Sequence, residues 1–281
     1  MSSPSVSAPA DFSSGVVLLE ISERIATITL NRPEARNALS SEVMGLLPKA
    51  MRTADESDDV DVIVLTGADP AFSAGLDLKE LGSSGRNLGA GIEKGSSAVE
   101  VQSPFPPVSK PLIGAINGVA VTGGLEIALN CDFLIASERA KFGDTHTRVG
   151  VMPGWGLTVL LSQAIGVRRA REMSFTGNFL SAEDALQWGL VNRVVPHADL
   201  IPTTRQLALD IIGNDQPGVR QIRSTYAAIN RDQAGWEIEA ADSEKWRRTM
   251  FAPEAVAARR QGIISRGRTQ ERATGGVRRG G

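Results

Sequence analysis

The chain has 281 residues, with 30 Lys or Arg against 32 Asp or Glu, so its formal net charge is −2. A charge so close to zero gives no overall basic field for nucleic acid, and two histidines and one cysteine exclude zinc-ribbon ligand sets and an internal disulfide. No apolar run approaches the ~18 residues that a membrane span needs, and the first residues lack the basic and apolar regions of a signal peptide. We therefore expect a cytoplasmic protein with no metal, nucleic-acid or membrane partner.

The first part of the chain predicts a hairpin and a helix. Residues 1–13 are rich in Ser, Pro and Ala and predict a flexible leader. Two β-branched apolar runs, 16–21 and 25–30, flank a short polar segment, which is typical of a β-hairpin. Apolar residues at helical spacing predict a helix over 40–54, which Pro48 should kink or split.

Strands and helices then alternate. Residues 60–66 form an almost continuous aliphatic run, as in a strand that is covered on both faces of a parallel sheet. A loop follows and includes a Gly/Ser-rich stretch over 82–91. Residues 112–121 predict a second buried strand that runs directly into a short helix over 122–130.

The alternation continues to about residue 195. Ser181, three residues before Asp184, resembles a helix capping box, and Gly189 is typical of the position just beyond a helix end. The elements predicted in this part are strands over 132–136 and 190–195 and helices over 156–165, 168–175 and 182–188.

No strand pattern remains after about residue 200, and residues 203–265 are helical throughout. Alternating strands and helices followed by helices alone indicate an α/β fold with a C-terminal helical region. We therefore expect four parts: a flexible leader over 1–13, a core over 14–200, a helical region over 201–265 and an Arg- and Gly-rich tail over 266–281.

Two segments place small residues where a buried strand gives way to a helix. One covers residues 66–80, and the other covers residues 110–132, where Gly123 and Gly124 precede a helix that carries Glu126 in its first turn. Small side chains let a ligand approach the backbone closely, and the unpaired N–H groups at the start of a helix can bind an oxyanion.

Together these segments resemble the enoyl-CoA hydratase, or crotonase, superfamily. The likeness covers about residues 16–200, and four motifs in the family's order carry it. They read NRPEARNAL over 31–39, AFSAGLDL over 71–78, NGVAVTGGLE over 117–126 and FGDTHTRVGVMPG over 142–154.

The resemblance implies a fold, a substrate and an assembly. Crotonase-fold proteins are spirals of repeated ββα units followed by C-terminal helices that pack against neighbouring subunits. The implied substrate is an acyl-CoA thioester, so coenzyme A arrives as part of the substrate and no separate cofactor is implied. The implied assembly is a homotrimer or a dimer of trimers.

The resemblance also implies a binding site. The backbone N–H groups of Leu76 and Gly123 match the family's oxyanion hole, which binds the thioester carbonyl and stabilises its enolate-like charge. The residues expected to contact coenzyme A or the acyl group are Arg36, Ala38, Ala74, Gly75, Asp77, Leu78, Gly124 and Trp155.

Hydration in this family typically uses two carboxylates, one to activate water and one to handle the proton at C2. Glu126 matches the first, although it could instead be a charge that the helix dipole favours. His146 stands where the family has its second glutamate. Histidine also transfers protons near neutral pH, so we interpret Glu126 as the base and His146 as the proton donor. Two alternatives stay open: His146 only fills space or holds a hydrogen bond, or Asp144 replaces it or orients it.

A second departure concerns Trp155. Residues 153–158 read PGWGLT where the family often has small residues. If Trp155 points into the acyl pocket, it shortens or reshapes that pocket; if it points away, it is an ordinary core residue.

The sequence therefore predicts an enoyl-CoA hydratase, a lyase that adds water across the 2,3 double bond of a 2-enoyl-CoA. A double-bond isomerase or a thioesterase of the same fold stays open because a second glutamate is missing. A binding protein that holds acyl-CoA without turnover is a further alternative. RNA binding, known for some members, is disfavoured because the early chain has no Lys-rich helix.

Overall fold

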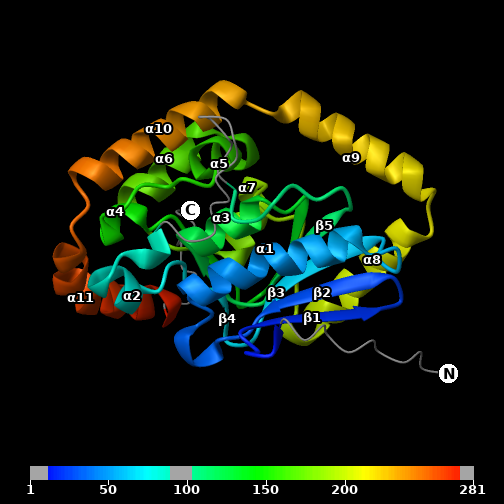
Figure 1. Cartoon of the computed structure of the whole chain (residues 1–281), viewed down its shortest axis with the longest axis horizontal. Coiled ribbons are helices and arrows are strands. Elements are labelled where there is room, and N and C mark those ends of the chain that lie inside the picture. Colours follow the sequence, from blue (N-terminus) through cyan, green and yellow to red (C-terminus); the bar gives the residue numbers. More distant parts are fainter. Residues whose placement is uncertain (1–11, 89–102, 273–281) are drawn as a thin grey trace, which may run out of the picture.

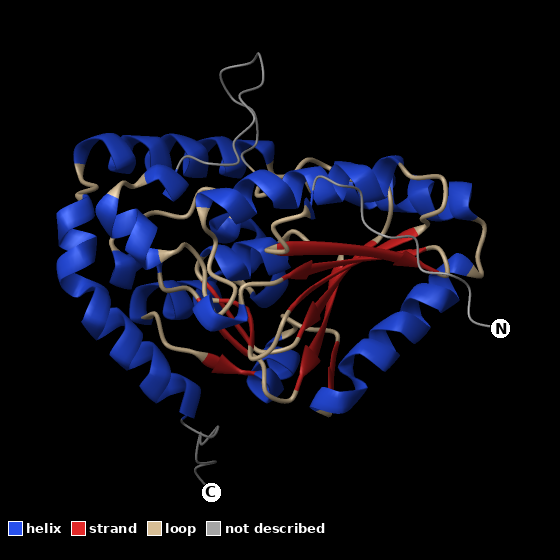
Figure 2. Ribbon diagram, turned by 60° about the horizontal axis from the view of Figure 1, so that its bottom comes forward, coloured by secondary structure: helices blue, strands red, loops and turns tan. Residues whose placement is uncertain are grey.

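The computed structural model describes residues 12–88 and 103–272. Residues 1–11 of the predicted leader, the Gly/Ser-rich stretch from residue 89 onward and residues 273–281 of the predicted tail lie outside this part. The described chain forms two β-sheets with helices around them (Figures 1 and 2). No helix in the described ranges is long and apolar enough to cross a bilayer.

The larger sheet has six strands in the order β1-β2-β3-β5-β7-β10. The first pair is antiparallel, which confirms the predicted hairpin, and all other neighbours are parallel. The strands are β1 (Val17–Ser22), β2 (Ile25–Leu30), β3 (Val62–Gly67), β5 (Leu112–Ile116), β7 (Phe133–Ser137) and β10 (Arg193–Val195).

Strand β3 shows why its sequence is aliphatic without interruption. Ile63 and Leu65 belong to the main core, whereas Val62 and Val64 belong to a second core cluster on the opposite face of the sheet. Helix α8 (Leu200–Ile212) supplies Leu200 and Ala208 to that second cluster. Because alternate side chains of a strand point to opposite faces, a strand covered on both sides needs apolar residues at every position.

The smaller sheet comes from the same chain segments as the larger one. Its order is β4-β6-β8-β9, made of Ala71–Ser73, Val119–Val121, Lys141–Gly143 and Leu180–Ser181. Three successive turns of the chain each contribute one strand to the larger sheet, one to the smaller sheet and then a helix. These helices are α2 (Leu78–Ser83), α3 (Gly123–Leu129) and α4 (His146–Val149).

This repetition confirms the predicted spiral of ββα units, and it has a consequence for the site. Strands β4, β6 and β8 are hydrogen-bonded in sequence, so the helices that follow them begin at adjacent points of the molecule. Residues at the starts of α3 and α4 are therefore brought together although 20 residues separate Glu126 from His146 in the chain.

The remaining helices surround the sheets, and the C-terminal ones, coloured yellow to red in Figure 1, run around the edge of the molecule. Helix α8 packs on the larger sheet, α10 packs on α5, and α11 packs on α2 and α4. The helices not yet described are α1 (Ser41–Glu56), α5 (Leu157–Ile165), α6 (Val167–Thr176), α7 (Ala182–Trp188), α9 (Gln216–Asn230), α10 (Gln233–Thr249) and α11 (Pro253–Arg272), with 3-10 turns at Pro33–Ala35, Arg86–Leu88 and His197–Asp199.

Three predicted boundaries were wrong. The predicted strand over 112–121 is divided into β5 and β6 at Gly118, where a Cβ atom would lie 2.2 Å from the carbonyl oxygen of Pro70. Helix α1 continues through Pro48, since Pro48 is itself buried among the apolar residues with which α1 packs on the core. Helix α11 continues past residue 265 to Arg272, and Glu271 near its end pairs with Arg36.

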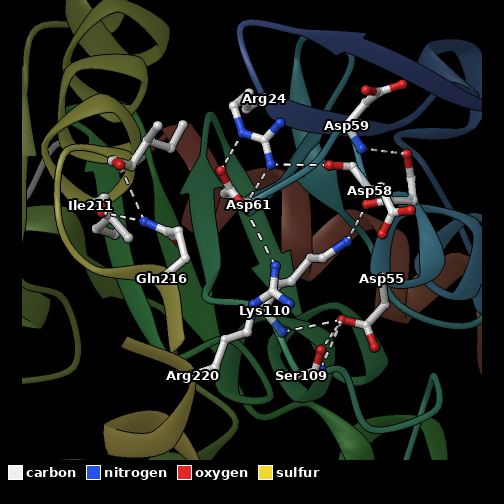
Figure 3. A network of polar contacts seen from close by, with 12 residues as sticks. Arg24, Asp55, Asp58, Asp59, Asp61, Ser109, Lys110, Ile211, Gln216 and Arg220 are labelled. Carbon is white, nitrogen blue, oxygen red and sulfur yellow. Dashed lines mark hydrogen bonds and ion pairs between the residues drawn. The ribbon is translucent and has the colours of Figure 1, made fainter. Parts of the chain in front are cut away.

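A polar network joins the amino ends of the central strands to α9 (Figure 3). The buried carboxylate of Asp61, just before β3, accepts hydrogen bonds from Arg24, which hold the pKa of that carboxyl below its usual range. Arg220 of α9 lies 3.4 Å from the same carboxylate. Lys110 donates to the carbonyl oxygens of Ala54 at 2.9 Å and Ser57 at 2.6 Å at the end of α1. The chain leaves β3, β5 and β7 at their opposite, carboxyl ends on its way to α2, α3 and α4. This network therefore stabilises the fold rather than forming the site.

Candidate active site

Glu126 and His146 meet at the starts of two consecutive helices. Glu126 lies in the first turn of α3, and His146 is the first residue of α4. The Nε2 atom of His146 is 3.2 Å from Oε2 of Glu126, and both side chains are about 95% buried, with 5% and 4% exposed. The ββα repeat therefore brings together the two residues that the sequence singled out.

Asp144 fixes the imidazole of His146 from the other side. Its Oδ1 atom accepts from the backbone N–H of His146 at 3.1 Å and contacts the ring Nδ1 at 2.7 Å. Burial alone would raise the pKa of Asp144, but the charge and hydrogen bonds of His146 outweigh it and lower this pKa to about 2. Asp144 is thus a carboxylate that orients His146, one of the roles left open above.

The imidazole between these two carboxylates is held in its charged form. Burial disfavours the charge and lowers the pKa of His146, but Glu126 and Asp144 outweigh burial and raise it to about 10. An imidazolium donates from both ring nitrogens, which matches one acceptor at Nδ1 and one at Nε2. His146 can therefore give a proton on the side of Glu126.

The second oxygen of Glu126 is held by the backbone. Oε1 accepts from the N–H of Gly154 at 3.1 Å and from the N–H of Trp155 at 2.8 Å. A carboxylate has about four lone-pair sites. The contacts with Gly154, Trp155 and His146 use three of them. Glu126 is fixed in direction and keeps one acceptor site on Oε2.

The backbone around Leu76 and Gly123 is closely packed. The N–H of Leu39 donates to Gly75 and the N–H of Asp77 donates to Leu39. In a parallel bridge of this kind the N–H of the middle residue, Leu76, points to the opposite side. Gly75 has φ +77°, and a Cβ atom there would lie 3.2 Å from the nitrogen of Gly123. The first N–H groups of α3, including that of Gly123, have no partner within the helix.

Two cavities adjoin these residues. The smaller, about 50 Å³, is lined by Glu126, His146 and Trp155 among others. The larger, about 330 Å³, lies between the second motif and α11. Leu76 and Val151 line both cavities, so the two spaces adjoin at Leu76.

Most of the residues predicted to contact coenzyme A line the larger cavity, but two carry side chains with partners of their own. Arg36 forms an ion pair with Glu271 of α11. Asp77 caps α2 by accepting from the N–H groups of Lys79 and Glu80, and it lies 3.2 Å from Arg32. The predicted residues on the larger cavity are Arg36, Ala38, Ala74, Leu76, Asp77 and Leu78.

The three predicted glycines, Gly75, Gly123 and Gly124, are not among the residues that line either cavity. A Cβ atom at Gly124 would lie 2.3 Å from the carbonyl oxygen of Ser73, so Gly124 lets α3 pack on β4. A Cβ atom at Gly75 would lie 2.8 Å from the carbonyl oxygen of Val121, so Gly75 brings the chain of Leu76 against α3. Both glycines shape the site through the backbone.

Trp155 faces the smaller cavity. Its indole ring lies against Gly123, where a Cβ atom would be 3.0 Å from Cζ3, and it lines the space beside Glu126. Trp155 also belongs to the main hydrophobic core, so it combines features of the two orientations that the sequence left open.

Helix α10 was missed as part of the site. Trp246, Arg247 and Phe251, at and just beyond its end, line the smaller cavity. Glu239 of the same helix is buried and accepts from the N–H groups of Gly156 at 2.6 Å and Thr158 at 2.7 Å. Their sequence shows only an ordinary helical pattern, in which a buried glutamate cannot be told from an exposed one. Within residues 12–88 and 103–272, no group of three or more His, Cys, Asp or Glu is arranged to hold a metal ion.

Comparison with known proteins identifies the family. The family model described as enoyl-CoA hydratase/isomerase matches residues 20–264. The probable peroxisomal enoyl-CoA hydratase 1 of Arabidopsis thaliana is 41% identical over 71% of this chain and 74% of its own length. The short-chain-enoyl-CoA hydratase of Clostridium acetobutylicum is 36% identical over 76% of this chain and 81% of its own length. The crystal structure of an enoyl-CoA hydratase from Mycobacterium smegmatis is 49% identical, covers 84% of this chain and 99% of that one, and has a TM-score of 0.74. The chain belongs to the enoyl-CoA hydratase/isomerase family.

Proposed function

We propose that the protein adds water across the 2,3 double bond of a 2-enoyl-CoA. The observation that carries this proposal is the buried contact of 3.2 Å between Glu126 and His146, which pairs a carboxylate with a proton donor beside the smaller cavity. The names of the relatives support the same class of reaction.

The two cavities suggest how the substrate lies. Coenzyme A occupies the larger cavity, the thioester carbonyl lies at the N–H groups of Leu76 and Gly123, and the acyl group extends toward Glu126. N–H groups aimed at the carbonyl oxygen stabilise the negative charge that develops there during addition. The two cavities adjoin at Leu76, which supports this arrangement.

The proton transfers then follow from the partners of each side chain. Oε2 of Glu126 takes a proton from water while the hydroxide adds to C3, and the electrons of the double bond move onto the thioester oxygen. The enolate collapses by taking a proton at C2 from Nε2 of His146. Glu126 returns the proton it gained to Nε2 over the contact of 3.2 Å, and both groups regain their starting charge.

Asp144 determines which ring nitrogen of His146 takes part. It accepts a hydrogen bond from the Nδ1–H of His146, so that Nε2 is the nitrogen that gives and regains a proton. The N–H groups of Gly154 and Trp155 hold Oε1 of Glu126, so that Oε2 is the oxygen that faces water.

Loss of the ultraviolet absorbance of crotonyl-CoA, whose double bond is conjugated to the thioester, tests the proposal. We expect turnover by the wild-type chain and a reduction of kcat by about 10²–10⁴-fold in Glu126→Gln and in His146→Ala. Glu183→Gln, an exposed change on α7, is the control and should leave the rate unchanged. If crotonyl-CoA is not consumed but a 3-enoyl-CoA is converted to its 2-enoyl isomer, the proposal is wrong and the enzyme is an isomerase. If free coenzyme A is released instead, the proposal is wrong and the enzyme is a thioesterase.

We further propose that the protein works in the cytoplasm as a homotrimer or a dimer of trimers. Helix α9 has no buried residue. Ile222, Tyr226 and Ile229, at helical spacing on it, are 60%, 66% and 74% exposed. An apolar stripe of this kind on a solvent-facing helix supports a contact between subunits.

A further inference from the structure

A short loop lies between two buried carboxylates. Segment 154–158 offers four backbone N–H groups: those of Gly154 and Trp155 donate to Glu126, and those of Gly156 and Thr158 donate to Glu239. The hydroxyl of Thr158 also donates to Glu239. The loop that fixes Glu126 is thus itself fixed from the opposite side by a residue of α10, about 85 positions further along the chain.

Helix α10 holds this loop at two points one turn apart. Gly156 has φ +85°, and a Cβ atom there would lie 1.9 Å from Cη2 of Trp236, so the indole ring of Trp236 rests directly on the Gly156 backbone. Glu239, three residues later on α10, accepts the N–H of the same Gly156 at 2.6 Å. Trp236 and Glu239 lie on the same side of the helix, and together they leave Gly156 little freedom to move.

The charge of Glu239 is balanced only by neutral donors among the contacts described. The residue is 5% exposed, and burial raises its pKa while the hydrogen bonds of Thr158 oppose that rise. A buried carboxylate held by backbone N–H groups is costly to remove, because the donors are then left unpaired. The loop would have to shift to find other partners, and its shift would move the N–H groups that hold Glu126.

We propose that Glu239 is a positioning residue for the reaction: by holding Gly156 and Thr158, it sets the direction of the Glu126 carboxylate. This inference rests on the proposed function of Glu126, but not on any contact between Glu239 and the substrate. Helix α10 contributes no residue to the larger cavity. The binding of coenzyme A should therefore be independent of Glu239.

The test compares Glu239→Gln with Glu237→Gln, an exposed change on the same helix, using crotonyl-CoA. We expect kcat of Glu239→Gln to fall about 10–100-fold, since small misplacements of a reacting group have effects of this size, while KM stays within about three-fold. Glu237→Gln should match the wild type. A purely structural role would lower the melting temperature and leave kcat unchanged at temperatures where the variant is folded; a kcat within a factor of two of wild type overturns the proposal.

Two further measurements keep the test decisive. If Glu239→Gln does not fold, Thr158→Val, which removes one donor to Glu239, should lower kcat in the same direction by a smaller factor, and an unchanged kcat overturns the proposal. If the wild type hydrates no enoyl-CoA, the proposed function fails, and the imidazole titration of His146 by NMR then decides. A lower pKa of His146 in Glu239→Gln supports the coupling of Glu239 to Glu126, whereas an unchanged titration contradicts it.

Discussion

His146 is the residue that most distinguishes this site at the scale of single side chains. It lies between two carboxylates, Glu126 and Asp144, at 3.2 and 2.7 Å. In the proposed mechanism a carboxylate and an imidazolium act on the substrate, and they provide one base and one acid.

The first prediction concerns the charge of His146. Because its pKa is raised to about 10, the imidazole should stay protonated from pH 6 to 9 in an NMR titration. The chain has two histidines, so a His197→Gln variant assigns the two signals. Deprotonation of His146 near pH 7 would show that the two carboxylates do not hold the proton.

The second prediction follows from linkage. The folded chain retains a proton on His146 up to about pH 10, whereas the unfolded chain loses it near its ordinary value of 6.5. Folding then binds the extra proton between these values, so the contribution of His146 is full below about pH 6.5 and is lost as pH rises toward 10. Denaturant unfolding of the wild type and of His146→Gln should show free energies of unfolding that converge with rising pH. A difference that grows with pH would contradict the assignment.

At the scale of elements, the site depends on two helix starts and one glycine turn. Helices α3 and α4 provide Glu126 and His146 because β6 and β8 are neighbours in the smaller sheet. The turn at Gly75 brings the chain of Leu76 against the start of α3. These elements provide the backbone N–H groups that the proposed mechanism uses.

Gly75→Ala tests this turn. A Cβ atom would clash with the carbonyl oxygen of Val121 at 2.8 Å and would add the cost of φ +77° for a non-glycine residue, which is about 1–3 kcal/mol. We expect a lower melting temperature and a reduction of kcat. Gly166→Ala is the matched control, because it has φ +79° with no atom within 4 Å of the added Cβ. If both variants lose activity equally, the close approach at Gly75 does not matter to the site.

The sequence predicted these elements to different degrees. The cap at Ser181 is a local signal, and the structure confirms it. Strand β8 was missed because its three residues, Lys141–Gly143, are too few to show an alternation. The break at Gly118 depends on Pro70, which is distant in the chain and only comes close in the fold. Glu126 and His146 could be found from their motifs, but Glu239 could not, since its role requires knowing which loop α10 covers.

At the scale of the whole molecule, the exposed apolar stripe of α9 predicts self-association. Light scattering should give a mass three or six times that of one chain. Replacing Ile222 and Ile229 together by Ser should reduce this mass, whereas Ser224→Ala, on the same helix and also exposed, should not. A monomeric wild type would mean that the stripe has another use.

The most direct measurement of the proposed reaction is mass spectrometry of the product formed from crotonyl-CoA in water enriched in ¹⁸O. Hydration requires one labelled oxygen on C3 of an intact acyl-CoA, formed by the wild type and lost in Glu126→Gln. Two results would contradict the assignment of Glu126 and His146 as the base and acid of a hydratase. One is label in a free carboxylic acid, and the other is crotonyl-CoA that stays unconverted at every enzyme concentration.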